Sequence, residues 1–309
     1  MARNDMPAGA AKLRRRADIN QNWTGYLLIA PATVIMLAVI LYPLGLNIVM
    51  SFQKILMMKP HLGRPFTGLD NYADVLADPN FWRAAKNSLV WTVSTVVLQV
   101  LLGLTVATLL NKSIKGRGGI RGMMLIPWIT PGVVAAITWK WMYDGQFGII
   151  NHILTSLHII EKPIVWLGNM KTAMPAVIAE HAWKNFPFVA VMLLAAMQVI
   201  SSDLYEAADI DGANAWQKFW HITLAGIRPT LYLTILLATI WGFNSFDTIW
   251  LMTEGGPSGA TNTLTTYVYK ATFQAFNLGK AAAVAVVMFL ALLALVIVYA
   301  RAVQKEEKQ

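Results

Sequence analysis

The sequence has no cysteine in its 309 residues, and only 13% of them are charged. Without cysteine the chain can form no disulfide framework, no thiolate nucleophile and no cysteine-ligated metal site. An ordinary soluble domain carries about 25% charged residues, and a globule of this length cannot cover itself in water with so few. Hydrophobic residues make up 56% of the chain and the mean hydropathy is +0.51. Lipid must therefore solvate much of the surface.

The sequence also lacks a recognisable energy source. It contains no Gly-x-x-x-x-Gly-Lys-Ser/Thr nucleotide loop, since the glycine-rich stretch 116–119 lacks the following Lys-Ser/Thr. Glu180 and Asp247 are the acids expected inside the apolar stretches, and repeated carboxylate pairs typical of proton relays are missing. These absences disfavour a self-sufficient secondary transporter and a membrane-embedded enzyme. We expect no catalytic residue, cofactor or metal in this chain, and any energy input would come from another polypeptide.

Six stretches are long and apolar enough to cross a bilayer, which takes about 20 residues in a helix. The predicted spans are Gly25–Met50, Ser88–Leu110, Gly122–Met142, Ala173–Ile200, Leu231–Met252 and Ala281–Ala300. A cleaved signal peptide is the alternative for the first, but its apolar region is too long and no small-x-small site follows it. The sequence predicts an all-α integral membrane protein of six transmembrane helices.

The basic residues indicate the orientation of these spans. The formal net charge of +9 comes from residues that cluster beside apolar runs, which is typical of cytoplasmic loops and not of a nucleic-acid surface. The clusters lie in a tail over residues 1–23 and in the hairpin that holds Lys112, Lys115, Arg117 and Arg121. We expect cytoplasmic termini, at 1–23 and 304–309, around a membrane domain over 24–303. The sequence shows no solenoid repeat or low-complexity tract.

A polar segment over 201–229, between the fourth and fifth spans, has the pattern of two short helices. Asp203 is expected to cap the first with Glu206 three residues on, and Gly212 to end it in a left-handed turn. The second would present Trp216, Phe219 and Trp220 as an apolar face. An amphipathic helix on the inner leaflet and a docking element for a partner both fit this pattern. The acids of the segment suit an anionic membrane surface poorly.

The same segment resembles a known loop. Glu206-Ala207-Ala208, then Asp211-Gly212-Ala213, with Phe219, Ile222, Leu224 and Pro229 beyond, is similar to the EAA loop in permease subunits of binding-protein-dependent ABC importers. The family usually has an earlier proline at the end of the loop, where this chain has Ala225. The resemblance implies the type I permease fold, and it implies that Glu206, Ala207, Ala208, Asp211, Gly212, Ala213 and Phe219 couple the chain to an ATPase.

The resemblance also implies partners. Such a permease works as a heterodimer with a second, similar permease, together with two ATP-binding cassette subunits and an extracytoplasmic solute-binding protein, in a bacterial inner membrane. Closure of the ATPase dimer would move the loop as a lever and switch the spans between inward-facing and outward-facing states. This chain would form half of the pathway and catalyse no covalent chemistry.

Further motifs resemble the maltose-type carbohydrate branch of the family. They run from Ala30-Pro31 and Tyr42-Pro43, through Ile126-Pro127-Trp128, to Thr253-x-Gly255-Gly256-Pro257. A sugar or sugar derivative is therefore the expected solute, and a non-sugar solute is the alternative. The resemblance does not say which sugar is carried or whether it is anionic.

The resemblance places the solute path in the fourth and fifth predicted spans, at His181, Lys184, Asn185, Phe188, Trp241, Gly242 and Ser245. An aromatic ring such as Trp241 suits the apolar face of a sugar, and Asn185 and Ser245 can bond hydroxyls. Each residue also has a plainer interpretation. The aromatic side chains can simply pack, the polar ones can bond across helices, and Lys184 can pair with Glu180 one turn earlier.

Overall fold

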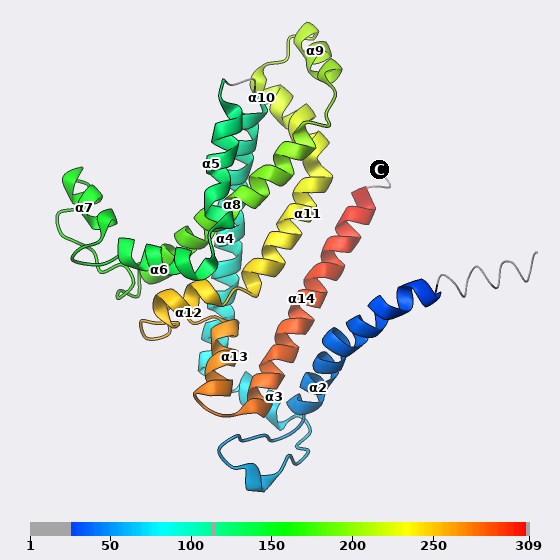
Figure 1. The fold of residues 1–309 in the computed structure, drawn as a ribbon, viewed down its shortest axis with the longest axis vertical. Coiled ribbons are helices and arrows are strands. Elements are labelled where there is room, and N and C mark those ends of the chain that lie inside the picture. The colour runs from blue at the N-terminus through cyan, green and yellow to red at the C-terminus, as the bar shows by residue number, and fades with distance from the viewer. Residues whose placement is uncertain (1–25, 113–114, 307–309) are drawn as a thin grey trace, which may run out of the picture.

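The computed structural model describes residues 26–112 and 115–306. The predicted N-terminal tail over 1–23 lies outside these residues. Within them the chain is almost entirely helical, and extended pairing is limited to the isolated bridges Gln53–Phe66 and Leu56–Asn277. In Figure 1 the long helices run between an upper end, where α9 (Ser202–Ile210) lies, and a lower end near α3 (Asp70–Leu76). We call these the coupling end and the opposite end.

Four helices of the described chain are each long and apolar enough to cross a membrane: Tyr26–Ser51, Pro79–Asn111, Ala215–Phe243 and Leu278–Arg301. Two further helix pairs qualify when each bent pair is taken as one span, which brings the crossings to six. The second is α4 (Pro79–Asn111), which begins about two and a half turns before the predicted start at Ser88. It begins there because Asp78 accepts a hydrogen bond from the Asn80 amide and Pro79 opens the helix. The last is part of α14 (Leu278–Glu306), which runs into the predicted C-terminal tail.

The predicted third span is not one straight helix. The chain forms α5 (Arg117–Ile129) and α6 (Gly132–Met142), which meet at an angle of 92°. Thr130 and Pro131 lie at the corner in extended conformation. Proline lacks an amide hydrogen and disfavours helical geometry in the residue before it, so the helix ends here. The apolar run continues through the corner, which is why composition alone did not reveal it.

The fourth crossing is α8 (Ala173–Met197), which ends close to its predicted boundary and bends by 71° into α9. The predicted fifth span, in contrast, ends too late. Helix α11 (Leu224–Phe243) stops at Phe243, and α12 (Asp247–Thr253) starts after a break at Asn244–Phe246. Asp247 was expected inside a span, but it is the first residue of α12 and not part of the crossing.

The core lies where α4 and α8 pack along each other. Gly103 of α4 permits this approach, because a Cβ added there would lie 2.6 Å from Val189 Cγ1. Val189 is 0% exposed and Trp91 is 1% exposed, so both side chains are buried where the two helices meet. Helix α11 packs against α4 and against α8. The three helices form the packed centre of the fold.

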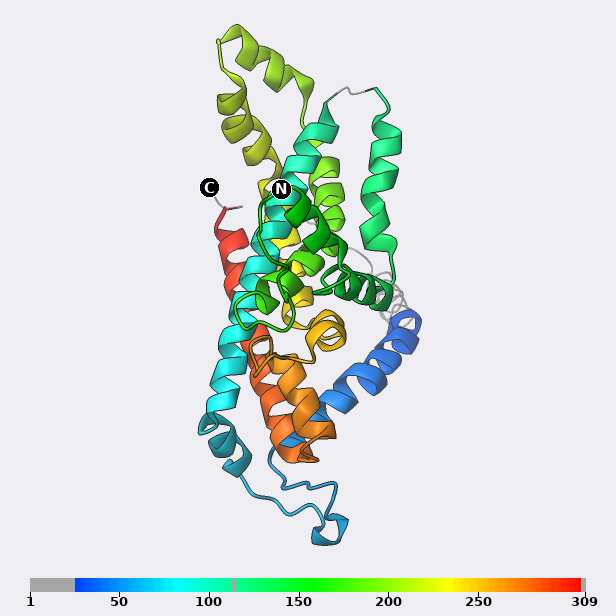
Figure 2. The same cartoon turned by 90° about the vertical axis from the view of Figure 1, so that its left-hand side faces the viewer.

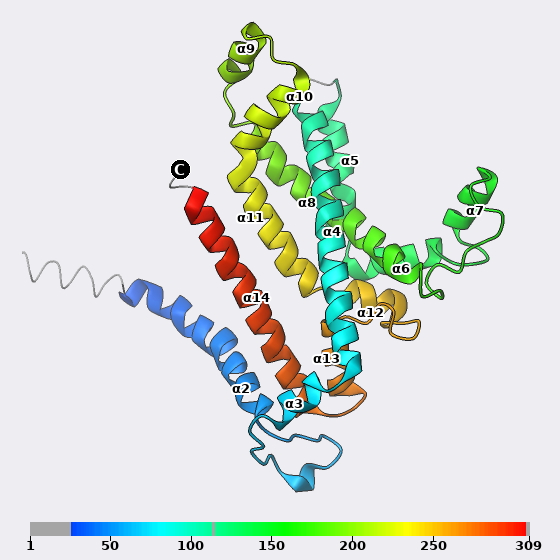
Figure 3. The same cartoon turned by 180° about the vertical axis from the view of Figure 1, so that it is seen from behind.

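Shorter elements cover the ends of this bundle. A π-helical turn (Leu37–Leu41) precedes α2 (Tyr42–Ser51), and a 3-10 turn (Pro60–Leu62) lies in the loop before α3. Helix α7 (Ile149–Ser156) projects to one side, and α13 (Leu264–Phe273) packs on α14. Figure 3 shows α2 and α14 meeting at the opposite end and separating toward the coupling end.

Candidate coupling loop and solute pathway

The coupling loop, residues 201–229, protrudes beyond the other helices (Figure 2). Its first helix, α9, is capped by Ser201, whose hydroxyl accepts a hydrogen bond from the Asp203 amide at 3.3 Å. The predicted cap at Asp203 was wrong, because Asp203 already lies inside the helix and Ser201 has the extended backbone of a cap residue. Asp203 instead places its charge in the first turn, where the helix dipole favours an acid.

The turn after α9 follows the prediction. Gly212 has φ of 75°, in the left-handed region, and the Ala213 amide donates to the Ala208 carbonyl at 2.9 Å. This bond closes the end of a helix around a left-handed residue. Asn214 then caps the next helix by a reciprocal pair of hydrogen bonds with Gln217, a capping box that the sequence analysis missed.

The second helix of the loop is continuous with the fifth crossing. Helix α10 (Ala215–Lys218) passes through a π-helical turn, η3 (Phe219–Thr223), into α11, so that one helical segment runs over Ala215–Phe243. Lys218 forms an ion pair with Asp209 of α9. The Tyr205 hydroxyl lies 2.9 Å from the Thr223 hydroxyl. These contacts join α9 to the base of α11, so a displacement of α9 can be passed along α11.

The outer surface of the coupling loop is apolar and acidic. Trp216 is 68% exposed and Trp220 is 47% exposed, and their rings meet edge to face at 5.5 Å. Ile210 is 88% exposed at the tip, and Glu206 and Ala207 are also exposed. No element of the described chain covers this surface. An exposed apolar patch of this kind marks a contact with a protein or a membrane.

Most of the predicted solute-path residues meet at one place. His181, Asn185 and Phe188 of α8 and Trp241 and Gly242 of α11 line a cavity of about 30 Å³, with Gln99 of α4 and Ala238. A buried water occupies a volume of about 10–15 Å³ on this scale. The cavity therefore has room for a water or two and not for a sugar ring.

Hydrogen bonds and close packing fix this cavity. The Trp91 indole donates to the Gly242 carbonyl at 2.9 Å, and its ring lies 4.9 Å from that of His181. A Cβ on Gly242 would lie 3.5 Å from the Thr95 hydroxyl oxygen, so α11 comes close to α4 here. The Asn185 amide nitrogen donates to the His181 carbonyl at 2.9 Å.

The aromatic residues of this region form a partly exposed row. The rings of Phe188 and Trp241 are 4.8 Å apart, and Trp128 of α5 lies 6.0 Å from Phe188. Trp241 is 52% exposed and Trp128 is 44% exposed. The row packs within the chain on one side and is open on the other.

Gln99 was missed by the sequence analysis. It is only 3% exposed, it lines the cavity, and its side chain makes no hydrogen bond within the described residues. A buried amide normally has partners. The signal for Gln99 in the sequence was a single amide inside an otherwise apolar span, which by itself does not distinguish a solute contact from a bond between helices.

Lys184 and Ser245 lie apart from the cavity. The Lys184 ammonium donates to the Thr130 carbonyl at 2.8 Å, at the α5–α6 corner. It forms no ion pair with Glu180, which is fully buried and whose two carboxylate oxygens have no hydrogen-bond partner among the described residues. Ser245 lies in the break after α11, where its carbonyl accepts from the Thr265 hydroxyl at 3.1 Å.

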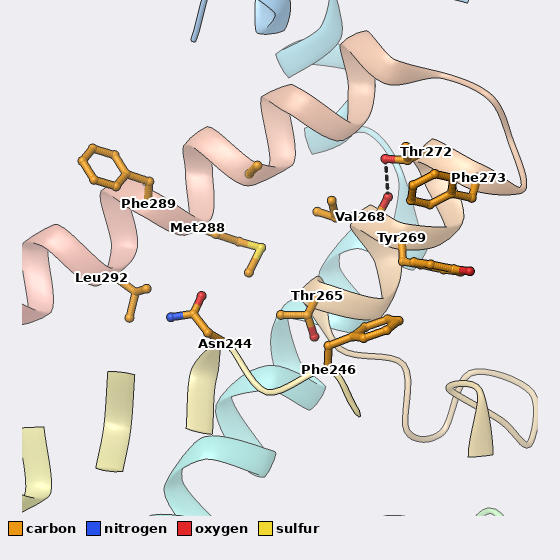
Figure 4. Close-up of a pocket in the computed structure, with 11 residues that line it drawn as sticks. Asn244, Phe246, Thr265, Val268, Tyr269, Thr272, Phe273, Met288, Phe289 and Leu292 are labelled. Carbon is orange, nitrogen blue, oxygen red and sulfur yellow. Dashed lines mark hydrogen bonds between the residues drawn. The ribbon is translucent and has the colours of Figure 1, made fainter. Parts of the chain in front are cut away.

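A second, larger hollow lies beside this break (Figure 4). It has a volume of about 440 Å³ and lies between the break, α13 and α14. Figure 4 shows the Asn244 amide directed toward the apolar side chains of Met288 and Leu292 in a mostly apolar lining that also includes Thr265 and Thr272. The predicted solute-path set did not include Asn244.

Known proteins are similar to this chain in sequence and in fold. Residues 99–308 match the family described as the binding-protein-dependent transport system inner membrane component. This chain belongs to that family. The trehalose/maltose transport system permease protein MalF of Thermococcus litoralis is 37% identical over 278 residues, covering 89% of this chain and 92% of that protein. The sulfoquinovosyl glycerol transport system permease protein SmoG of Agrobacterium fabrum is 32% identical over 293 residues, covering 95% of this chain and 94% of that protein.

The fold has close counterparts among solved structures. A chain of a bacterial ABC transporter involved in the import of the acidic polysaccharide alginate superposes with a TM-score of 0.81 at 22% identity, covering 94% of this chain and 99% of that one. A chain of the bacterial alginate transporter in complex with its alginate-bound periplasmic protein superposes with a TM-score of 0.77 at 23% identity. The match covers 92% of this chain and 94% of that one. The permease fold expected from the sequence is confirmed. The chain is a non-catalytic, multi-pass transport subunit of the inner membrane.

Proposed function

We propose that this permease forms half of the pathway by which a sugar or sugar derivative enters the cell, and that an ATPase drives it through the coupling loop. The relatives named above carry trehalose and maltose in one case and sulfoquinovosyl glycerol in the other. The observation that carries the proposal is the continuous helix from the exposed α10 to Trp241 and Gly242, which joins the coupling loop to the cavity.

A second permease subunit completes the pathway in this proposal. The cavity within this chain is too small for a sugar, while the Trp128, Phe188 and Trp241 row is open on one side. A facing subunit would turn that row into the wall of a shared channel. Aromatic faces bind the C–H faces of sugar rings, and the exposed Asn244 amide would supply hydrogen bonds to hydroxyl groups.

The coupling end faces the cytoplasm in this proposal. Arg117 and Arg121 of the basic hairpin lie at the same end of the fold as α9, and an excess of Lys and Arg is typical of cytoplasmic loops. On that side, Glu206, Ala207, Ala208, Asp211, Gly212, Ala213 and Phe219 meet the ATPase subunits. Nucleotide and magnesium are held there and not by this chain.

Reconstitution tests the proposed function. The chain would be purified with its second permease and ATPase and placed in lipid vesicles with the binding protein. We expect uptake of a labelled sugar that requires ATP and the binding protein. Uptake by vesicles that contain this chain alone would refute the proposal, and so would uptake that is indifferent to the ATPase. A screen of sugars and acidic sugars against the binding protein would identify the solute.

A further inference from the structure

A polar pocket of about 680 Å³ opens at the end opposite the coupling loop. It lies where the start of α4, the loop after α12, α13 and the start of α14 come together. Its lining includes the basic side chains of Arg83, Lys270 and Lys280 and a single acid, Asp78, among the described residues. It shares no lining residue with the cavity at Trp241.

Asp78 is fully engaged within the chain. Its carboxylate accepts hydrogen bonds from the Tyr267 hydroxyl at 2.7 Å and from the Lys280 ammonium at 2.8 Å. Burial by itself would raise the pKa of Asp78, but the hydrogen bonds from Lys280, Tyr267 and Asn80 outweigh it and lower the pKa to about 2. Asp78 therefore neutralises Lys280 and fastens α4 to α13 and α14. The remaining two cations then have no further acid among the described residues that line the pocket.

Arg83 and Lys270 are those cations. Arg83 is exposed and donates to the Ser258 carbonyl at 3.3 Å, a neutral acceptor. Lys270 is partly buried, and its ammonium has neither a hydrogen bond nor an ion pair within the described chain. Burial lowers the pKa of Lys270, and Glu254 acts against that through space. The pocket thus has an excess of positive charge, with the amides of Asn80, Asn262 and Gln274 around it.

We propose that this pocket is a docking site for the solute-binding protein, and that it receives a carboxylate side chain of that partner between Arg83 and Lys270. This inference rests on the proposed function. The pocket opens on the outer face if the coupling loop is cytoplasmic, and that is the face from which a binding protein approaches. The solved alginate transporter with its periplasmic protein is a precedent for such a complex in this fold.

Docking of a partner at this pocket can affect the solute pathway through the contacts between α4, the loop after α12, and α12 itself. A carboxylate held by both Arg83 and Lys270 would join α4 to α13, which follows the loop after α12. That loop is already tied to α4, because the Asn87 amide donates to the carbonyls of Gly259 and Asn262, both at 3.0 Å. Helix α12 packs against α6 and α8. Arginine pairs with carboxylates through two parallel hydrogen bonds, which favours an acidic partner group over a neutral one.

The test uses the whole transporter in lipid nanodiscs and, as probe, the binding protein that supports uptake by the wild-type complex. Arg83→Gln and Lys270→Gln remove charge without adding a new one. Lys86→Gln is the matched control, since Lys86 is exposed on α4 near Arg83 but does not line the pocket. We expect the double variant to bind the probe at least tenfold more weakly, with a smaller loss on adding salt, and the control to stay within twofold.

The outcomes separate this inference from its premise. Assembly and basal ATP hydrolysis should be unchanged in the double variant, because the hydrogen bonds of Asp78 and Asn87 still hold α4 to α13, α14 and the loop after α12. Unchanged probe affinity would overturn the docking site. If affinity is unchanged but an acidic solute needs a higher concentration for half-maximal uptake, the pocket binds solute instead and the proposal is wrong. A wild-type complex without binding-protein-dependent uptake would refute the proposed function itself.

Discussion

Replacing Gly212 isolates the contribution of one backbone turn to coupling. Gly212 has φ of 75°, and a Cβ added there would meet no atom within 4 Å. A substitution therefore introduces conformational strain without a clash. An L-residue in the left-handed region costs roughly 1–2 kcal/mol, and a β-branched residue is a greater outlier there.

That magnitude fixes the size of the expected effect. A change of about 1–2 kcal/mol alters an equilibrium by a factor of about 5–30. The turn aligns α9 with α10, which are also joined by the Lys218–Asp209 ion pair. If the docked loop requires the turn, Gly212→Ala should lower ATPase binding by about that factor and Gly212→Val by more. Gly212→Asn should stay close to wild type, since asparagine tolerates this conformation.

The assay compares sugar uptake with ATP hydrolysis for the three variants in reconstituted vesicles. We expect the amount of sugar carried per ATP, or the amount of bound ATPase, to fall in the order Asn, Ala, Val. Insertion and α-helix content should be equal, because the turn lies outside the crossings. Equal coupling in the Val and Asn variants would refute the reasoning that this turn orients the lever.

Further predictions follow from single contacts. Lys184→Met should weaken the α5–α6 corner and lower thermal stability while uptake persists, since the ammonium is bonded to the Thr130 carbonyl; loss of uptake of an anionic solute at unchanged stability would contradict this. Gly103→Val should destabilise the bundle by about 1–3 kcal/mol through overpacking against Val189, measured as a lower melting temperature in nanodiscs. The lowered pKa of Asp78 adds stability that is present above its ordinary value of 3.8 and lost as pH falls toward 2. The melting temperature of the Asp78→Asn variant should therefore not fall over this pH range as that of the wild type does. If the two proteins lose stability equally as the pH falls, the hydrogen bonds of Asp78 do not stabilise the fold in this way.

The sequence predicted the helical membrane fold and the two short helices of the segment 201–229, because both depend on local signals. Apolar length located the first and last crossings within a few residues, and the left-handed requirement at Gly212 is a property of one residue type. The corner at Pro131 and the break at Ser245 were missed because the apolar runs continue across them. Hydropathy averages over a window and does not register a change of direction.

The candidate solute site was predicted less completely. The family resemblance grouped His181, Asn185, Phe188, Trp241 and Gly242, which do line one cavity. Lys184 was expected either to contact solute or to pair with Glu180, and the acceptor it has, the Thr130 carbonyl, is far away in sequence. The place of Gln99 in the cavity lining depends on the packing of α4 against α8, which the sequence does not give. Whether these side chains touch a sugar stays a prediction.

Cross-linking gives the most direct test of the central claim, that the coupling loop meets the ATPase. Because the chain has no cysteine, one introduced by Glu206→Cys is its only thiol, and one introduced by Ser258→Cys at the other end is a matched control. A bifunctional thiol-to-amine reagent is added to the assembled complex in nanodiscs, and products are identified by mass spectrometry. We predict that the thiol at 206 is joined to the ATP-binding subunit and the thiol at 258 is not. Linkage of the thiol at 258 to the ATPase, with none at 206, would contradict the account.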